Sequence, residues 1–452
     1  MEKNLTTGSV FKNVILFSLP YLLSYFLQTL YGMADLFIIG QFDGVAGTTT
    51  VSIGSQVMHM LTVMIVGLAM GATVSIGQSI GANDRKQASQ DVGNTIVLFM
   101  AVSIALMTVL LILVNPIVSA MSTPSEAIDG TAAYLTICFI GIPFITAYNI
   151  ISSIFRGMGD SKSPMYFIAV ACAANIGLDY LFMGFFRLGP VGAALGTIVS
   201  QAISVAVSLV VILKRKSIVL VKSDFKPCRS VMEKILKIGL PITLQDGFIQ
   251  ISFIVITIIA NRRGLADAAA VGIVEKIMSF LFLIPSSTLS TVSTLGAQNI
   301  GAKKPERAIK TLRCAVLLAM SVSFVIAVCV QFIAEPIIAL FIDSSRTDGT
   351  EVIYLGGQYL RGYVWDSFFA CLQFGFSGFF CAIGRSGFSF LHNVLSIVCI
   401  RIPGAYLASK HFANTLFPMG LASAMGSLFS DIVCLIIFVR LMKSAKHSLK
   451  EG

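Results

Sequence analysis

The chain has 452 residues, of which 56% are hydrophobic and only 12% are charged. In soluble domains about a quarter of all residues are charged, so this composition excludes a water-soluble protein. It indicates an all-α integral membrane protein. The formal net charge of +10 would suit nucleic acid, but the distribution of the basic residues, described below, accounts for it without that partner.

Twelve apolar segments are each long enough to cross a bilayer as a helix of about 20 residues. In chain order they cover residues 14–40, 48–80, 93–120, 132–155, 165–186, 189–213, 236–260, 270–300, 314–342, 355–382, 388–409 and 416–441. The stretch before the first segment has no small-residue cleavage site, so we expect this segment to remain as a span rather than to act as a signal peptide. No period-two alternation appears, which argues against a β-barrel.

The basic residues fix the expected orientation of these spans. If the N-terminus is cytoplasmic, 24 of the 32 Lys and Arg residues fall on the cytoplasmic side, eight of them in the segment 214–237. This bias follows the positive-inside rule, so both termini are predicted to be cytoplasmic in a multi-pass protein of the cell inner (plasma) membrane. Contact of the same charges with anionic lipid is compatible with this topology.

Three pairs of similar segments, 220 to 230 residues apart, indicate an internal repeat. They are LPYLLSYFLQT from residue 19 with LPITLQDGFIQ from 240, GQSIGANDRKQA from 77 with AQNIGAKKPERA from 297, and GPVGAALG from 189 with FPMGLASA from 417. We therefore expect two six-helix halves, residues 1–220 and 221–452. Because six crossings return the chain to its starting side, the halves should be parallel repeats around a central cavity that forms the substrate path. The alternative is a duplication with a purely structural role.

Acidic residues within spans are costly and usually face a cavity or a partner. In the first half, Asp35 follows Gln28 by two helical turns, and Asn175 and Asp179 share a helical face at i and i+4. Thr197 follows in the sixth span. These oxygen atoms could bind Na⁺, with Asp35 and Asp179 as the metal ligands, and two close carboxyls could also carry a proton. The alternative is that both acids lie at wet span ends.

The second half carries Asp246, Glu275, Asp366 and Asp431 within its spans, together with Arg401. A buried Arg without a carboxylate is expensive, so we expect a structural ion pair of Arg401 with Asp366 or Glu275. Asp246 stands one turn after Pro241, where a kink would free backbone carbonyls. It is a candidate for substrate contact, and Asp246, Glu275 and Asp366 are predicted to line the pocket.

The sequence contains none of the common catalytic or nucleotide-binding motifs of enzymes. There is no HExxH, GxSxG or GxxxxGK[ST], the nine cysteines lack disulfide or CxxC spacing, and the four histidines lack metal spacing. We expect a protein that is not an enzyme, binds no cofactor and uses an ion gradient rather than ATP.

The order and spacing of several motifs resemble the multidrug and toxic compound extrusion (MATE) family across nearly the whole chain. They are ADLFIIG with Asp35, GQSIGA, FRGMGDSKSP, NIGLDYLFMG, GPVGAALGT and, in the second half, AQNIGA. The resemblance implies efflux of organic cations and other drugs driven by Na⁺ or H⁺. It places the cation site at Asp35, Asn175, Asp179 and Thr197, with Gln28 and Tyr134 lining the same pocket. The acid and tyrosine of a second-half sodium site, found in some members, have no clear counterpart here.

Two functions remain as hypotheses. The first is a monomeric antiporter that exports small amphipathic or cationic compounds in exchange for H⁺ or Na⁺. The second is a flippase for a lipid-linked precursor, since such flippases share this fold in the wider superfamily. Flippases of that kind usually have extra spans and cationic cavities, whereas this chain has twelve predicted spans and acids in its first half, which favours the antiporter.

Overall fold

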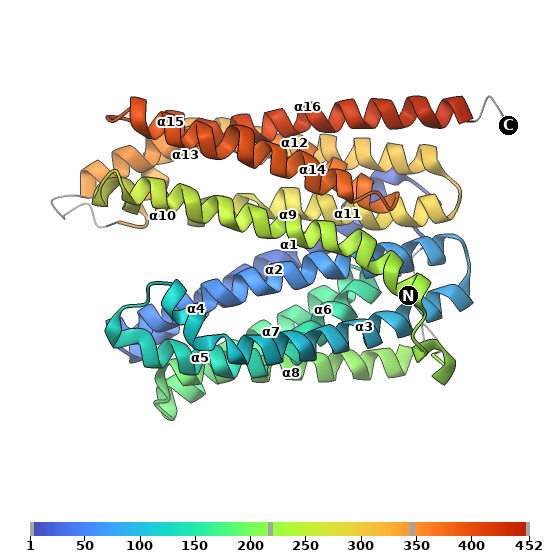
Figure 1. Ribbon diagram of the computed structural model, residues 1–452, viewed down its shortest axis with the longest axis horizontal. Helices are drawn as coiled ribbons and strands as arrows, with labels where there is room; N and C mark the ends of the chain where they lie inside the picture. The colour runs from blue at the N-terminus through green and yellow to red at the C-terminus, as the bar shows by residue number, and fades with distance from the viewer. Residues whose placement is uncertain (1–3, 216–219, 343–348, 449–452) are drawn as a thin grey trace. The chain divides into compact units, whose positions relative to one another are not determined.

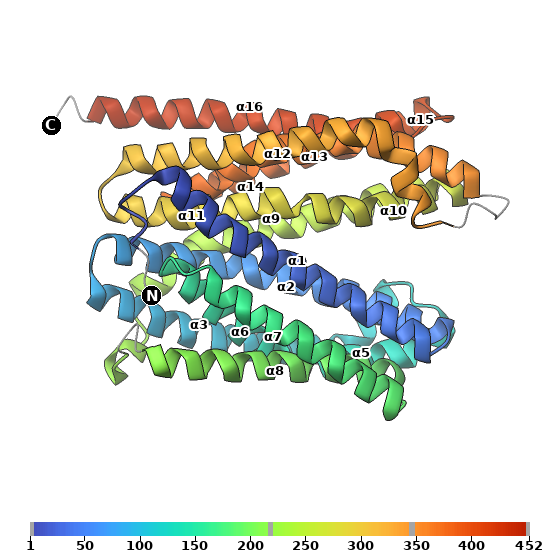
Figure 2. The ribbon, with the colours of Figure 1, turned by 180° about the vertical axis from the view of Figure 1, so that it is seen from behind.

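The computed structural model describes residues 4–215, 220–342 and 349–448. All regular secondary structure in these residues is helical (Figures 1 and 2). The charges of the N-terminal residues 1–3, of residues 216–219 and of residues 449–452, which contribute to the predicted topology, lie outside the described residues.

The first half of the chain forms eight α-helices and a π-helical turn. These are α1 (Val10–Phe42), α2 (Val45–Gly81), α3 (Arg85–Ile112), α4 (Val114–Ala120), α5 (Ile128–Ile140), α6 (Ile142–Gly157), α7 (Lys162–Asp179), the π-helical turn η2 (Tyr180–Phe185) and α8 (Gly189–Arg215), with a short 3-10 turn η1 (Ser125–Ala127) before α5. The N-cap residue Asp84 accepts a hydrogen bond from the Gln87 N–H at the start of α3. Asp160, two residues before α7 begins, accepts from the Ser163 N–H.

The second half repeats this pattern. It comprises the 3-10 turn η3 (Lys222–Phe225), α9 (Arg229–Asn261), α10 (Leu265–Leu281), α11 (Leu283–Gly301), α12 (Pro305–Ala339), α13 (Gly349–Ala382), α14 (Gly387–Ser396), the π-helical turn η4 (Ile397–Arg401), α15 (Ile402–His411) and α16 (Phe417–Ser448). In each half, the helix of the fifth predicted span of that half contains a π-helical turn: η2 ends this helix in the first half, and η4 joins α14 to α15 in the second. Such turns are rare and are frequent at functional sites.

The helices correspond to the predicted spans. Ten helical segments of the described residues are long and apolar enough to cross a bilayer, and the pair α5–α6, bent by 47° at Gly141, makes an eleventh. The remaining prediction, 355–382, falls on α13, whose 34 residues exceed the bilayer thickness at 1.5 Å per residue. This helix is less apolar because it carries charged residues such as Arg361 and Asp366. The chain is thus an all-α membrane protein.

Backbone conformation marks the repeat independently of sequence similarity. Asn83 and Lys303, which are 220 residues apart, have φ of 59° and 57°, and each follows the paired GQSIGA or AQNIGA motif. Gly159 and Gly384, 225 residues apart, have φ of 85° and 72°. Left-handed conformations are rare outside glycine, so their recurrence at matched positions supports the two repeats.

By packing, the chain forms two compact units that differ from the predicted sequential halves. The first unit comprises residues 1–8, 15–243 and 297–304, and the second comprises residues 9–14, 244–296 and 305–452. The division at 220/221 follows the sequence repeat and remains a prediction. The first unit has two apolar cores, one around Tyr134 and Phe139 and one around Phe99 and Phe155. The core of the second unit surrounds Tyr359 and Tyr363.

Within the first unit, the two copies of the repeated motif contact each other. A Cβ at Gly81 would lie 1.9 Å from the backbone oxygen of Gln298, and a Cβ at Gly301 would lie 2.0 Å from the backbone oxygen of Gln78. The contact is reciprocal, because each glycine approaches the glutamine of the other copy. Only glycine permits this approach of the ends of α2 and α11. We call this contact the glycine seam.

Asn94 of α3 holds the segment that precedes α9. Its Nδ2 donates to the backbone oxygens of Asp224 (3.2 Å) and Lys226 (3.3 Å), and its Oδ1 accepts from the Cys228 N–H at 2.6 Å. These bonds fix the described part of the basic segment against the first unit.

Candidate functional site

The four residues of the predicted cation site lie together in the first unit. The Thr197 hydroxyl of α8 donates to Asp35 Oδ2 of α1 at 3.3 Å, and Asn175 Nδ2 donates to Asp179 Oδ1 within α7 at 3.5 Å. Asp35 and Asp179 also interact electrostatically, and Asp179 Oδ1 lies against Gly196, which directly precedes Thr197. Three helices that are distant in sequence therefore bring two carboxyls, an amide and a hydroxyl into one cluster.

The cluster is buried rather than solvated. Asp35 is 3% exposed, and Asn175 and Asp179 are both fully buried. Four oxygen atoms in and beside it accept no hydrogen bond from the described residues: Asp35 Oδ1, Asn175 Oδ1, Asp179 Oδ2 and Gln201 Oε1. Buried acceptors without donors are costly. A proton or a small metal cation bound among these oxygen atoms would satisfy them.

Local sequence explains how the helices come this close. A Cβ on Gly196 would lie 2.1 Å from Asp179 Oδ1, so only glycine at this position lets the carboxyl lie against α8. Asp179 is also the last residue of α7, directly before the π-helical turn η2. A π turn rotates the following residues around the helix axis relative to a regular α-helix. The residue types of NIGLDYLFMG did not predict this turn.

Two further polar residues belong to the cluster and were not predicted. Tyr31 lies one turn before Asp35 on α1 and interacts with Asp35, Thr197 and Gln201. Gln201 follows Thr197 by one turn on α8 and is 5% exposed. The i, i+4 spacing from residues already identified was the available signal, but tyrosine and glutamine are common at span ends and in apolar segments, so the spacing alone does not select them.

The predicted lining residues Gln28 and Tyr134 are placed differently. Tyr134 of α5 is 2% exposed and interacts electrostatically with Asp35 and Tyr31. A Cβ at Gly54 would lie 2.3 Å from its ring, which shows how closely the ring packs on α2. Gln28 is half-buried on α1, two turns before Asp35.

In the second unit, Arg401 and Asp366 form an ion pair. Arg401 Nη2 lies 3.4 Å from Asp366 Oδ2 and donates to the Tyr363 hydroxyl at 2.8 Å. The guanidinium also lies 5.0 Å from the ring centre of Phe253. On the other side of the pair, the Ser427 hydroxyl donates to Asp366 Oδ1. Arg401 ends η4, so both π-helical turns adjoin a buried charged residue.

The other two predicted lining residues of this unit differ in their surroundings. Glu275 of α10 is partly buried, accepts hydrogen bonds from the Thr257 hydroxyl at 3.2 and 3.3 Å, and interacts electrostatically with Arg401. Asp246 of α9 is partly buried and interacts electrostatically with the Cys381 thiol. The structure therefore pairs Arg401 with Asp366, while Glu275 interacts with Arg401 only electrostatically.

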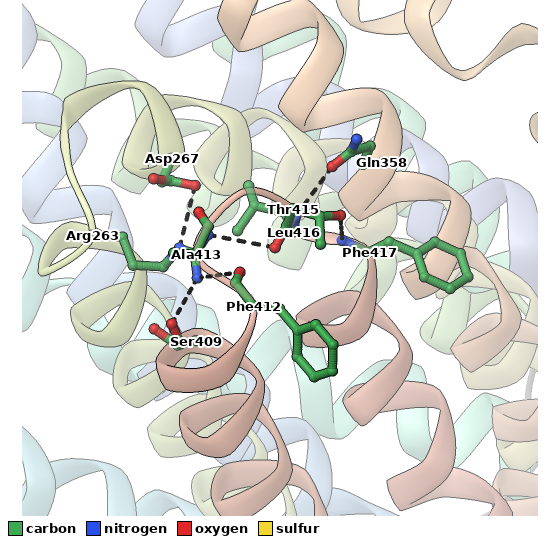
Figure 3. A network of polar contacts seen from close by, with 9 residues as sticks. All are labelled: Arg263, Asp267, Gln358, Ser409, Phe412, Ala413, Thr415, Leu416 and Phe417. Atoms are coloured by element: carbon green, nitrogen blue, oxygen red, sulfur yellow. Dashed lines mark hydrogen bonds and ion pairs between the residues drawn. The ribbon is translucent and has the colours of Figure 1, made fainter.

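A second arginine of this unit binds backbone (Figure 3). Arg263, which ends the turn after α9, donates from Nη1 to the Ser409 oxygen at 2.9 Å and from Nη2 to the Ala413 oxygen at 2.8 Å. Its Nε lies 3.3 Å from Asp267 Oδ1. The guanidinium thus satisfies carbonyls left free at the end of α15. The sequence did not predict this role of Arg263, since backbone carbonyl acceptors cannot be recognised from residue types.

Long apolar helices in two repeats, with carboxyls buried among them, are the architecture of a secondary transporter. The chain belongs to the MatE family, whose model matches residues 20–181 and 241–407. It is therefore a multidrug efflux (MATE) family transporter and not an enzyme.

Several named relatives match most of the chain. The chain is 29% identical over 433 residues to the probable multidrug resistance protein YpnP of Bacillus subtilis (strain 168), which covers 96% of both chains. It is 27% identical to the probable multidrug resistance protein YoeA of the same organism, over 89% of this chain and 88% of the relative. Multidrug export protein MepA of Staphylococcus aureus (strain MSSA476) is 24% identical over 96% of this chain and 95% of the relative.

Solved structures share the fold. An outward-facing multidrug resistance MATE family transporter of the MOP superfamily superimposes with a TM-score of 0.90 at 20% identity, over 99% of this chain and 98% of that chain. A MATE crystal structure in complex with MaL6 gives a TM-score of 0.90 at 20% identity and covers 99% of both chains.

Proposed function

We propose that the chain is an antiporter that exports small amphipathic or cationic organic compounds in exchange for H⁺ or Na⁺ bound by Asp35, Asn175, Asp179 and Thr197. The observation that carries the proposal is the group of buried oxygen atoms in this cluster that lack donors. The names of the relatives, which are multidrug resistance and multidrug export proteins, support export of drugs. They give no corresponding support to the flippase hypothesis.

The chemistry of the cluster is suited to an exchangeable ion. Asp35 and Asp179 interact electrostatically within the cluster, and two neighbouring carboxyls can share one proton in a hydrogen bond. Alternatively, one Na⁺ could be coordinated by both carboxyls, the Asn175 amide oxygen and the Thr197 hydroxyl. In either case the bound ion neutralises the carboxyls, and its release leaves two adjacent negative charges that repel each other. This difference in charge can favour different conformations with and without the ion.

The remaining features of the proposal concern the setting of the site. We place the protein in the plasma membrane with both termini cytoplasmic, on the basis of the positive-inside bias. We expect a monomer to suffice, because all four residues of the proposed cation site come from one compact unit. Tyr134 and Gln28 would line the substrate path beside the ion, and Asp246, Glu275 and Asp366 would line it in the second unit.

The test is transport by purified protein in proteoliposomes with an imposed Na⁺ or H⁺ gradient. We predict that Asp35→Asn and Asp179→Asn each express and unfold like the parent but reduce ion-driven efflux of a cationic dye at least tenfold. A neutral amide accepts no proton and coordinates Na⁺ more weakly, so coupling is lost while packing is kept.

Asp129→Asn is the matched control, because Asp129 is an exposed acid at the start of α5, and it should transport at the parental rate. Parental rates in both site variants would show that the ion binds elsewhere. The gradient that drives the parent, Na⁺ or H⁺, identifies the coupling ion.

A further inference from the structure

The second unit contains a buried carboxyl that the proposed exchange cycle does not use. Asp431 lies on α16 and is 2% exposed. Neither of its carboxyl oxygens has a hydrogen-bond partner among the described residues. An ionised carboxylate without partners in such a place costs several kcal/mol. Asp431 therefore requires a bound proton or cation.

The titratable groups that interact electrostatically with Asp431 come from two elements. On α13, Asp366 interacts electrostatically with Asp431, and so does the Cys371 thiol. On α16 itself, Cys434 interacts with it from less than one turn away. Two basic groups of the neighbouring elements have other partners. Arg401 of η4 pairs with Asp366, while His392 of α14 is held between the hydroxyls of Ser377 and Ser430.

Charge balance then distinguishes the two carboxyls. Asp366 has a guanidinium at 3.4 Å and the Ser427 hydroxyl as a donor, so its negative charge is compensated. Asp431 has neither. Since one guanidinium compensates one carboxylate, ionising Asp431 as well would place two negative charges near a single positive one in a low-dielectric environment.

The ligand chemistry favours a proton over a metal cation. A hard metal cation needs several oxygen ligands, and the first unit offers them from three helices. Around Asp431 the titratable groups that interact with it are a carboxyl that already binds Arg401 and two thiols. The fixed positive charge of Arg401 further disfavours a second cation. A proton needs only the carboxyl oxygen itself.

We propose that Asp431 is a proton-binding group of the second unit, separate from the cation cluster of Asp35 and Asp179. The step is a simple protonation: an O–H bond forms on one carboxyl oxygen of Asp431 when water delivers a proton, and it breaks when the proton returns to water. When Asp431 releases its proton, its new negative charge lies near Asp366, whose own negative charge is compensated by Arg401. The role of this proton in transport rests on the proposed function, but its binding does not.

Binding can be measured directly by infrared difference spectroscopy of purified protein in lipid nanodiscs during a pH titration. The parent should show the carbonyl stretch of a protonated carboxyl that shifts in D₂O. We expect Asp431→Asn to lose one such band and to bind one proton fewer per molecule, whereas Asp35→Asn and Asp179→Asn keep that band. Asp431→Glu should restore a band at a shifted frequency, which a general change in packing would not do.

The outcomes separate this inference from the proposed function. If Asp431→Asn leaves every carboxyl band and the proton count unchanged, Asp431 binds no exchangeable proton and the inference is wrong. If the band is lost in Asp431→Asn while Asp35→Asn and Asp179→Asn transport normally, the inference stands and the proposed ion site fails. A band that is lost in both Asp431→Asn and Asp431→Glu, with altered thermal unfolding in both, would assign Asp431 a structural role and contradict the inference.

Discussion

The ion pair between Arg401 and Asp366 lies almost out of contact with solvent, with 8% and 0% of the two side chains exposed. Removing one partner of a buried pair leaves an uncompensated charge and typically costs about 3–5 kcal/mol. We therefore predict that Arg401→Ala lowers the midpoint of thermal unfolding in detergent by several degrees and reduces the yield of folded protein.

The double variant Arg401→Ala/Asp366→Asn is the control, because it removes both charges together. It should recover a large part of the lost stability. If Arg401→Ala unfolds like the parent but no longer transports, Arg401 acts in transport rather than in packing.

The same residue scale shows what the sequence could and could not predict about the sites. Asn175 and Asp179 were predicted to share a face because the i, i+4 spacing is a property of any α-helix, and the structure places them so. Arg401 forms its ion pair with Asp366 rather than with Glu275 because of the packing of α13, α16 and η4. Local sequence does not encode this packing. That Asp431 has no hydrogen-bond partner among the described residues is likewise a property of the assembled unit.

At the scale of elements, the glycine seam makes a specific demand on sequence. The ends of α2 and α11 approach so closely that a methyl group at Gly81 or Gly301 would overlap a backbone oxygen, which cannot move aside as a side chain can. We predict that Gly81→Ala and Gly301→Ala each destabilise the protein by about 1–3 kcal/mol, as overpacking does. Unfolding midpoints of the purified variants measure this.

Gly32→Ala is the matched control for the seam. Gly32 lies inside α1 with open space around the added Cβ. Alanine there should be neutral or stabilising by up to about 1 kcal/mol, because alanine favours helix more than glycine. Equal effects at all three positions would mean that the seam is not a tight contact in the protein as it exists in the membrane.

Elements were predictable to different degrees for physical reasons. Apolar length predicted all twelve spans, because lipid imposes this requirement on every crossing, and eleven of them are long and apolar enough in the described residues of the structure. It marked α13 only weakly, because this helix faces protein over most of its length and can carry Arg361 and Asp366. The π-helical turns η2 and η4 were not predicted, since a turn with an extra residue has no composition of its own.

At the scale of the whole molecule, the charge bias predicts that the segment before α9 is cytoplasmic and that the turn between α9 and α10 lies outside. Two residues report on these sides. Cys228 lies just before α9, where a hydrogen bond with the Ser230 hydroxyl and one with the Val231 backbone lower the pKa of its thiol. A lower pKa raises the thiolate fraction at neutral pH and hence the reactivity toward maleimides. Leu265, at the start of α10, is 84% exposed.

We predict that a membrane-impermeant maleimide labels Cys228 only after the cells are permeabilised, and that this labelling disappears in Cys228→Ser. In the Cys228→Ser background, Leu265→Cys should instead be labelled in intact cells. Both results follow from one orientation, because a single crossing by α9 separates the two positions. Labelling of Cys228 in intact cells together with protection of Leu265→Cys would invert the predicted topology, and with it the assignment of the termini to the cytoplasm.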